Sequence, residues 1–184
     1  MPEKNIFLNG AAKAGLVLGG VSIAGMLLSW LLGKVGSDSR GAIVIVSVLN
    51  TLLWVAKFVA CIFLMRLFMR KFSFSEPEAD NSRVFRFGML TALLSALVYS
   101  AFYMAYLMFI DPDSINMALD ILRENPMMDS NSLAKMEEMA PMMPTYAFFT
   151  NLIYCFIYGT ILSAILSRNI PPRNPFEGGD YNRQ

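Results

Sequence analysis

The chain contains no histidine, and only 16% of its 184 residues are charged. A soluble domain usually carries about 25% charged residues, so this chain is poorly suited to an ordinary water-facing surface. The absence of histidine removes the commonest general base and the commonest transition-metal ligand. The net charge of +1 argues against a nucleic-acid-binding protein, which would show a basic patch or stripe.

Cysteine is also scarce. Cys61 and Cys155 both lie in apolar runs, which argues against a disulfide framework. The sequence shows no nucleophile beside a base, no phosphate-binding loop and no paired carboxylates within an apolar segment. We therefore expect a non-enzymatic protein without a cofactor.

Long apolar runs are abundant, in keeping with a hydrophobic content of 55%. About 20 apolar residues are needed for a helix to cross the hydrocarbon core of a bilayer. The first run exceeds the roughly 7–15 apolar residues of a signal peptide core, so we interpret it as a retained span. The sequence predicts an all-α membrane protein, one membrane domain over residues 1–184, with four transmembrane helices at about 14–33, 42–65, 87–110 and 145–166.

The distribution of Lys and Arg predicts the orientation. The N-terminus, the 66–86 connection and the tail at 167–184 carry ten of these residues, whereas the 34–41 and 111–144 loops carry four. Because cytoplasmic loops hold the excess of Lys and Arg, both termini are predicted to be cytoplasmic. The predicted location is the bacterial inner membrane, with the 111–144 loop outside.

The external loop at 111–144 predicts two short amphipathic helices, one ending before Pro126 and the other before Pro141. Their apolar stripes could lie on the membrane surface or cover the helix bundle. Clustered methionines are good fillers of irregular apolar surfaces, but thioethers also select Cu(I), so a copper site is a weak alternative. The methionines in question are Met136, Met139, Met142 and Met143.

Small residues recur along the first span. Ala11, Gly15 and Gly19 are spaced by four, and Gly20 and Ala24 repeat the spacing one residue on. Such spacing lets two helix backbones approach closely. The partner helix is either another span of this chain or the same span of a second copy in a homo-oligomer.

Lys57 interrupts the second apolar run, and a charge in such a place often marks a site. The spans contain no Asp or Glu to pair with it. One interpretation is that the amine snorkels toward the inner leaflet. The other is a polar cavity that holds Lys57 against hydroxyls, water or an anion. Judged by depth, the residues of this binding site would be Lys57, Ser95, Tyr99 and Tyr158.

Residues 81–113 (NSRVFRFGMLTALLSALVYSAFYMAYLMFIDPD), the acidic, methionine-rich loop and residues 161–176 (ILSAILSRNIPPRNPF) carry a family resemblance. The chain resembles a family of four-span bacterial membrane proteins of the Bacteroidota, known as domain of unknown function 4199. The resemblance covers essentially the whole chain. It implies four spans, and it implies no activity and no functional residues.

Two functions follow as hypotheses. The first is a non-enzymatic partner or scaffold of another membrane protein in the lipid bilayer. The alternative is a small oligomeric transporter or channel component that uses Lys57 in a polar cavity. A polar pocket around Lys57 would favour the alternative.

Overall fold

The computed structural model describes residues 2–35, 40–76, 80–125 and 128–170, and nearly all of them are helical. The third long helix ends in a short π-helical turn, and a 3-10 turn precedes the last helix. The elements are α1 (Pro2–Val35), α2 (Arg40–Ser75), α3 (Asn81–Ala105), the π-helix (Tyr106–Ile110), α4 (Asp113–Arg123), α5 (Ser130–Met139), the 3-10 turn (Ala140–Met142) and α6 (Met143–Arg168).

Local sequence signals explain where the later helices begin. The side chain of Asp80 accepts a hydrogen bond from the Asn81 backbone N–H at 2.7 Å, which caps the start of α3. Pro144 lies in the first turn of α6, where its missing N–H would have no helical partner anyway. Between these ends the spans stay helical, because only a helix satisfies every backbone polar group within one segment in lipid.

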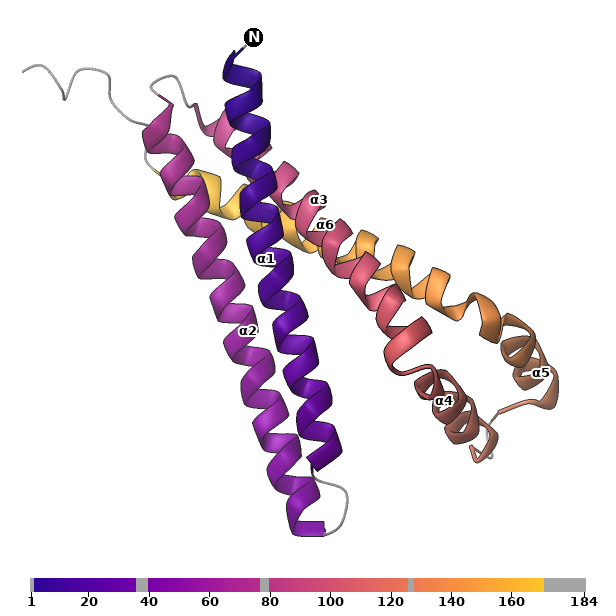
Figure 1. Ribbon diagram of the computed structural model, residues 1–184. Helices are drawn as coiled ribbons and strands as arrows, with labels where there is room; N and C mark the ends of the chain where they lie inside the picture. Colours follow the sequence, from indigo (N-terminus) through magenta and orange to yellow (C-terminus); the bar gives the residue numbers. More distant parts are fainter. Residues whose placement is uncertain (1, 36–39, 77–79, 126–127, 171–184) are drawn as a thin grey trace, which may run out of the picture.

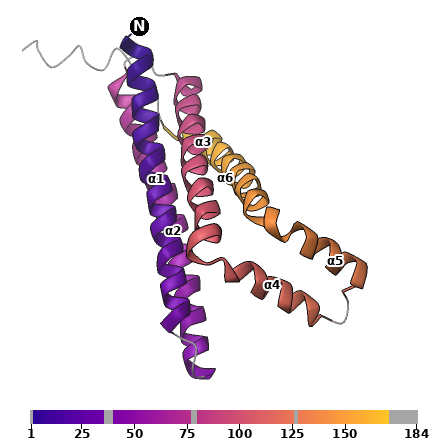
Figure 2. The ribbon, with the colours of Figure 1, turned by 45° about the vertical axis from the view of Figure 1, so that its right-hand side comes forward.

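The four long helices form two pairs. α1 runs beside α2, α3 runs beside α6, and α1 also packs along α3 (Figure 1). The pairs approach each other at the end that holds the N-terminus. Toward the end that holds α4 and α5, α6 moves away from α1 and α2, whereas α3 stays beside α1 as far as Trp30 and Tyr106, whose ring centroids lie 6.4 Å apart (Figure 2). The chain therefore has one closed end and one open end.

The hydrophobic core lies at the closed end. Its largest cluster combines the first half of α1 with the last third of α2, the first half of α3 and the end of α6. Within it, the ring of Phe7 meets Phe72 and Phe87 edge-on, and Phe72 stacks on Phe87 with centroids 4.3 Å apart. Ile170, just beyond α6, belongs to the same cluster, so both ends of the described chain meet here.

The contact between α3 and α6 depends on small residues. A Cβ placed on Gly159 would lie 2.5 Å from the Cβ of Ala92, and one placed on Gly88 would overlap the Ser163 hydroxyl. Ser163 Oγ donates a hydrogen bond of 2.9 Å to the backbone carbonyl of Phe85 across this contact. In lipid the hydrophobic effect does not drive helices together, so close backbone approach and interhelical hydrogen bonds are the usual means of joining them.

Three of the five small residues of the first span lie in the interior of this chain. Ala11 is fully buried, and a Cβ on Gly15 or Gly19 would lie 2.8 Å or 3.0 Å from the side chain of Leu94 or Val98 in α3. Gly20 and Ala24 take no part in this contact. Gly20 has nothing within 4 Å of a Cβ position, and Ala24 is exposed. The face with Gly15 and Gly19 is thus already occupied by α3.

Four helices in the described part of the chain are long and apolar enough to cross a membrane: Phe7–Lys34, Val44–Ser75, Asn81–Ile110 and a segment within Ser130–Arg168. Large apolar side chains on their outer faces are exposed, for example Phe63 at 64% and Val44 at 63%. Exposed apolar surface on this scale fits lipid as the surrounding solvent. The side on which the termini lie stays a prediction.

The 111–144 loop contains α4 and α5, which form a hairpin beyond α3 and α6 (Figure 2). Arg123 joins the two helices, because its guanidinium contacts Asp120 of α4 at 2.7 Å and Glu137 of α5 at 2.8 Å. The hydrogen bond to Glu137 raises the pKa of the Arg123 guanidinium further above its usual range. Met117 and Ile121 of α4 are exposed, which suits a membrane surface.

Arg123→Gln should loosen the hairpin without affecting the bundle. We expect faster amide hydrogen exchange in α4 and α5 and an unchanged melting temperature, because exposed ion pairs contribute little to global stability. Hydrogen-exchange mass spectrometry of the wild type and the variant in the same detergent would check this. Lys135→Gln is the control, since none of the ion pairs found in the described residues includes Lys135.

Candidate functional site

Lys57 lies at the middle of α2, and its side chain points toward the other helices and is half-buried. Its aliphatic stem rests on Gly25 of α1. A Cβ placed on Gly25 would lie 2.7 Å from Lys57 Cδ and 3.2 Å from Cγ, so only glycine leaves room for the stem. The amine lies 6.0 Å from the ring centroid of Tyr99 in α3, at the far limit of a cation–π contact.

Lys57 opens onto a cavity of about 290 Å³ lined by all four long helices. The four residues that the sequence predicts for the site, Lys57, Ser95, Tyr99 and Tyr158, all line this cavity. Its other polar lining comes from Ser22, Cys61, Asn151, Tyr154 and Cys155, and its apolar lining includes Leu18, Phe58, Met65, Ala92, Ala96 and Leu162.

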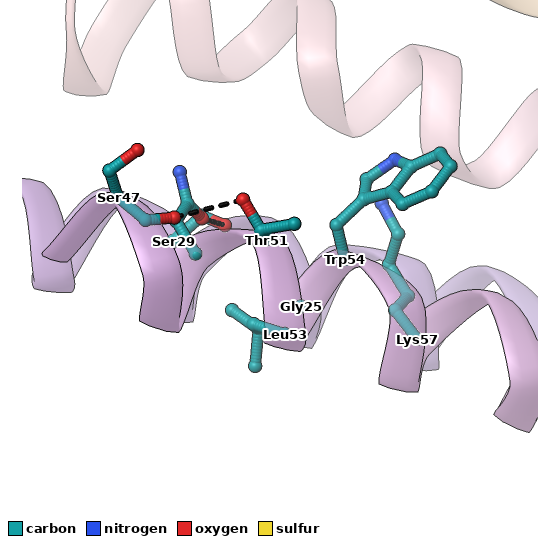
Figure 3. A pocket seen from close by; sticks show the side chains of 8 residues that line it. Gly25, Ser29, Ser47, Thr51, Leu53, Trp54 and Lys57 are labelled. Carbon is teal, nitrogen blue, oxygen red and sulfur yellow. Dashed lines mark hydrogen bonds between the residues drawn. The ribbon is translucent and has the colours of Figure 1, made fainter. Parts of the chain in front are cut away.

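A second cavity, of about 360 Å³, lies between α1 and α2 toward the open end. Lys57 and Trp54 line both cavities, so they stand where the two meet. Ser47, Thr51, Trp54 and Lys57 point to the same side of α2 (Figure 3). Spacings of three and four residues place such a series on one helix face. The rest of the lining comes from Gly25, Ser29, Asn50 and Leu53.

The polar groups of these cavities are partly bound to one another. Ser29 donates a short hydrogen bond to the side-chain oxygen of Asn50 across α1 and α2. Thr51 Oγ1 donates to the Ser47 carbonyl at 2.9 Å, and the Ser22 hydroxyl lies 3.8 Å from the Cys61 sulfur. Among the described residues only the oxygen of the Asn50 amide is hydrogen-bonded, which leaves its amide hydrogens as donors.

Charge is the main feature of the site. The spans contain no Asp or Glu, and none of the ion pairs among residues 2–35, 40–76, 80–125 and 128–170 includes Lys57. A lysine near the bilayer centre costs about 2.5–3.5 kcal/mol on insertion scales. The amine is thus a positive charge without a counter-ion, next to donors and hydroxyls, and an anion could bind there.

Aromatic rings lead from Tyr99 toward the open end of the bundle. Tyr103 stacks on Tyr99 and on Tyr106, with centroids 6.2 Å apart in both pairs. Tyr106, in the π-helical turn, donates a hydrogen bond of 2.8 Å to Asp111 Oδ2. Single π-helical turns often occur at functional sites. This one brings the carboxylate of Asp111 onto the last tyrosine of the row.

The sequence did not point to several residues that shape the site, among them Gly25, Trp54, Asn151 and Cys155. Helical spacing from Lys57 could have signalled Trp54, which lies three residues earlier, but contacts between different helices leave no such signal. Among the described residues no group of three His, Cys, Asp or Glu could hold a metal. In the methionine cluster, Met139 and Met142 are exposed, and the copper alternative stays a prediction.

Comparison with known proteins agrees with the architecture. A family model described as Protein of unknown function (DUF4199) matches residues 13–168, which include three of the candidate spans and all but the first six residues of the span Phe7–Lys34. No curated protein and no solved structure matches the chain. The chain belongs to the DUF4199 family, and it is a membrane protein with four helices able to span the bilayer.

Proposed function

We propose that this protein binds an anion inside the membrane at Lys57, as a small transporter or channel component without enzymatic activity. The bacterial inner membrane, with both termini in the cytoplasm, is the proposed location. The observation that carries the proposal is the position of Lys57 where two partly polar cavities meet, with no acidic residue in any span.

The packing of Lys57 supports this function over snorkelling. A snorkelling lysine lays its stem along the lipid-facing surface and directs its amine to the headgroups. Here the stem lies on Gly25 of the neighbouring helix, and the amine lies above Tyr99 on a third helix. A side chain enclosed by three helices is placed to meet a ligand between them.

The positive charge of Lys57 should therefore raise the concentration of an aqueous anion beside Trp54. In protein with Trp30→Phe, placed in lipid nanodiscs, Trp54 is the sole tryptophan. We expect iodide to quench its fluorescence about five times less strongly after Lys57→Met, because two charges about 4 Å apart attract by about 1 kcal/mol even in water. Stern–Volmer titrations at constant ionic strength measure the effect.

Two controls make this test specific. Quenching by neutral acrylamide should be the same with and without Lys57→Met, which shows that water access is unchanged. Lys57→Arg should keep the iodide effect, since arginine keeps the charge. Equal iodide quenching in the wild type and Lys57→Met would show that the charge attracts no anion, and the proposed function would be wrong.

A scaffold for another membrane protein is the second candidate. Most of α2 outside its contact with α1 is exposed, including Phe63 and Leu52, and a protein partner could cover this face. Lipid would cover it equally well. Affinity purification in mild detergent with mass spectrometry separates the two, because a scaffold must bring down a stoichiometric partner that Phe63→Ser releases.

A further inference from the structure

The two cavities that meet at Lys57 differ in lining. In the cavity toward the open end, four of the eight lining residues carry neutral polar side chains, Ser29, Ser47, Asn50 and Thr51, and Lys57 adds its amine. The cavity shared by the four helices has a larger apolar share of lining, although serines, tyrosines, cysteines and Asn151 also line it. Lys57 therefore lies between a more polar compartment and a more apolar compartment.

A small hydrated anion matches only the polar compartment. Apolar cavities stay dry and take up apolar molecules, so the space beside Leu18, Phe58 and Leu162 suits a hydrocarbon chain. Each cavity has a volume close to or within the roughly 300–1,000 Å³ of small-molecule sites. An occupant of both would carry a charged group at one end and a chain at the other.

The length of the apolar compartment fits such a chain. It extends along α2 from Lys57 to Met65, eight residues later, which is about 12 Å along a helix. Ala92 and Ala96 of α3 form part of its wall, and both are buried, with Ala92 also packed against Gly159 of α6. The surroundings of the bundle are lipid, so a ligand with a chain could reach this space from the bilayer.

We propose that the ligand of the Lys57 site is an anionic amphiphile with one hydrocarbon chain, carrying a carboxylate or a phosphate monoester. Its charged group lies against the Lys57 amine and the amide hydrogens of Asn50. Its chain lies between Phe58, Leu18 and Leu162. This inference rests on the proposed anion site and adds the chain to it.

Bromoundecanoate, with bromine on the carbon next to the carboxylate, tests the inference because bromine quenches a tryptophan that it touches. In Trp30→Phe protein in nanodiscs, Trp54 lines both cavities beside Lys57, so it lies next to the charged end of the bound ligand. The Trp30→Phe change loses no hydrogen bond, since in the described residues the buried Nε1 of Trp30 has no partner. Undecyl phosphate carries no bromine and serves as the competitor. Its ability to displace bromoundecanoate shows whether the site accepts a phosphate monoester as well as a carboxylate.

We expect saturable quenching by bromoundecanoate, with the half-quenching concentration raised about tenfold by Lys57→Met. Bromoundecanol, which has the chain without the charge, should quench both proteins alike and without saturation. Leu162→Asn should weaken the binding of bromoundecanoate and leave iodide quenching of Trp54 unchanged, because the substitution alters only the apolar compartment. If undecyl phosphate displaces bromoundecanoate, the site accepts both a carboxylate and a phosphate monoester. If it does not, the ligand is restricted to carboxylates.

The outcomes separate this inference from the proposed function. If iodide quenching depends on Lys57 while bromoundecanoate behaves like bromoundecanol in both proteins, the chain inference is overturned and the anion site stands. If neither probe responds to Lys57→Met, both are wrong. Quenching by bromoundecanoate that acetate abolishes at equal concentration would also overturn the inference, since the chain would then add no affinity.

Discussion

Replacing Gly88 with leucine should separate α3 from α6 and leave little folded protein. A Cβ at this position would overlap the hydroxyl of Ser163 and lie 2.9 Å from its Cβ and 3.0 Å from the sulfur of Met69. Both Ser163 and Met69 are fully buried, so neither can move aside into free space. We expect a loss of at least about 3 kcal/mol, the upper end of the usual cost of overpacking.

Thermal unfolding followed by size-exclusion chromatography in mild detergent would measure this loss. Gly20→Leu is the matched control, because nothing lies within 4 Å of a Cβ at Gly20 and its melting temperature should barely change. A double-mutant cycle of Gly88→Ala with Ser163→Gly should show favourable coupling, since the second change removes the obstructing side chain. Equal melting temperatures for Gly88→Leu and Gly20→Leu would contradict the described contact of α3 with α6.

Gly25→Leu should abolish anion attraction at Lys57 while the bundle stays folded. A side chain at Gly25 would occupy the space of the Lys57 stem, with Cγ and Cδ of Lys57 as its nearest neighbours. The three atoms nearest to a Cβ at Gly25 all belong to the flexible Lys57 side chain, so we expect the lysine to move rather than the helices. We expect iodide quenching of Trp54 to fall as far as it does after Lys57→Met, about fivefold.

The melting temperature should change by far less than it does after Gly88→Leu. Gly33→Leu, in the same helix, is the control, because a Cβ there meets nothing within 4 Å. It should keep both the iodide effect and the stability of the wild type. Unaltered iodide quenching in Gly25→Leu would show that the Lys57 amine reaches the anion without lying on Gly25, and the described site would need to be redrawn.

The spans were predictable because a long run of apolar residues directly indicates lipid, rather than water, around a helix. The predicted first span at 14–33 lies inside α1, Pro2–Val35, and the second at 42–65 lies inside α2, Arg40–Ser75. Hydropathy marks the part of a helix in hydrocarbon, whereas backbone hydrogen bonding continues into the polar flanks. The helices therefore extend beyond the predicted spans at most ends, and the prediction of four spans agrees with four helices long and apolar enough to cross a membrane in the described part of the chain.

Depth along the helices gave the sequence prediction of the site. The sequence predicts Lys57, Ser95, Tyr99 and Tyr158 to stand at one depth, and the structure places all four around one cavity. Depth could not reveal Gly25, since a glycine becomes important only through the side chain that rests on it. For the same reason depth gave no hint of the second cavity, which lies between α1 and α2.

The helix contacts were the least predictable part of the fold. The small residues of the first span form two overlapping series, and the sequence cannot say which one faces a neighbour. The structure buries Gly15 and Gly19 against α3 and leaves Gly20 without a contact. The pair of Gly88 and Gly159, which joins α3 to α6, was overlooked because neither glycine belongs to a visible repeat of glycines.

The concentration of the core at one end has a mechanical consequence. α6 is packed in the core at one end, and its other half, on the side of α4 and α5, lies away from α1 and α2. We expect thicker or more tightly ordered lipid to press this half of α6 inward, and thinner or more fluid lipid to let it move outward. The cavity that Lys57 shares with Tyr154, Cys155 and Tyr158 of α6 would then change in width with the membrane around the protein.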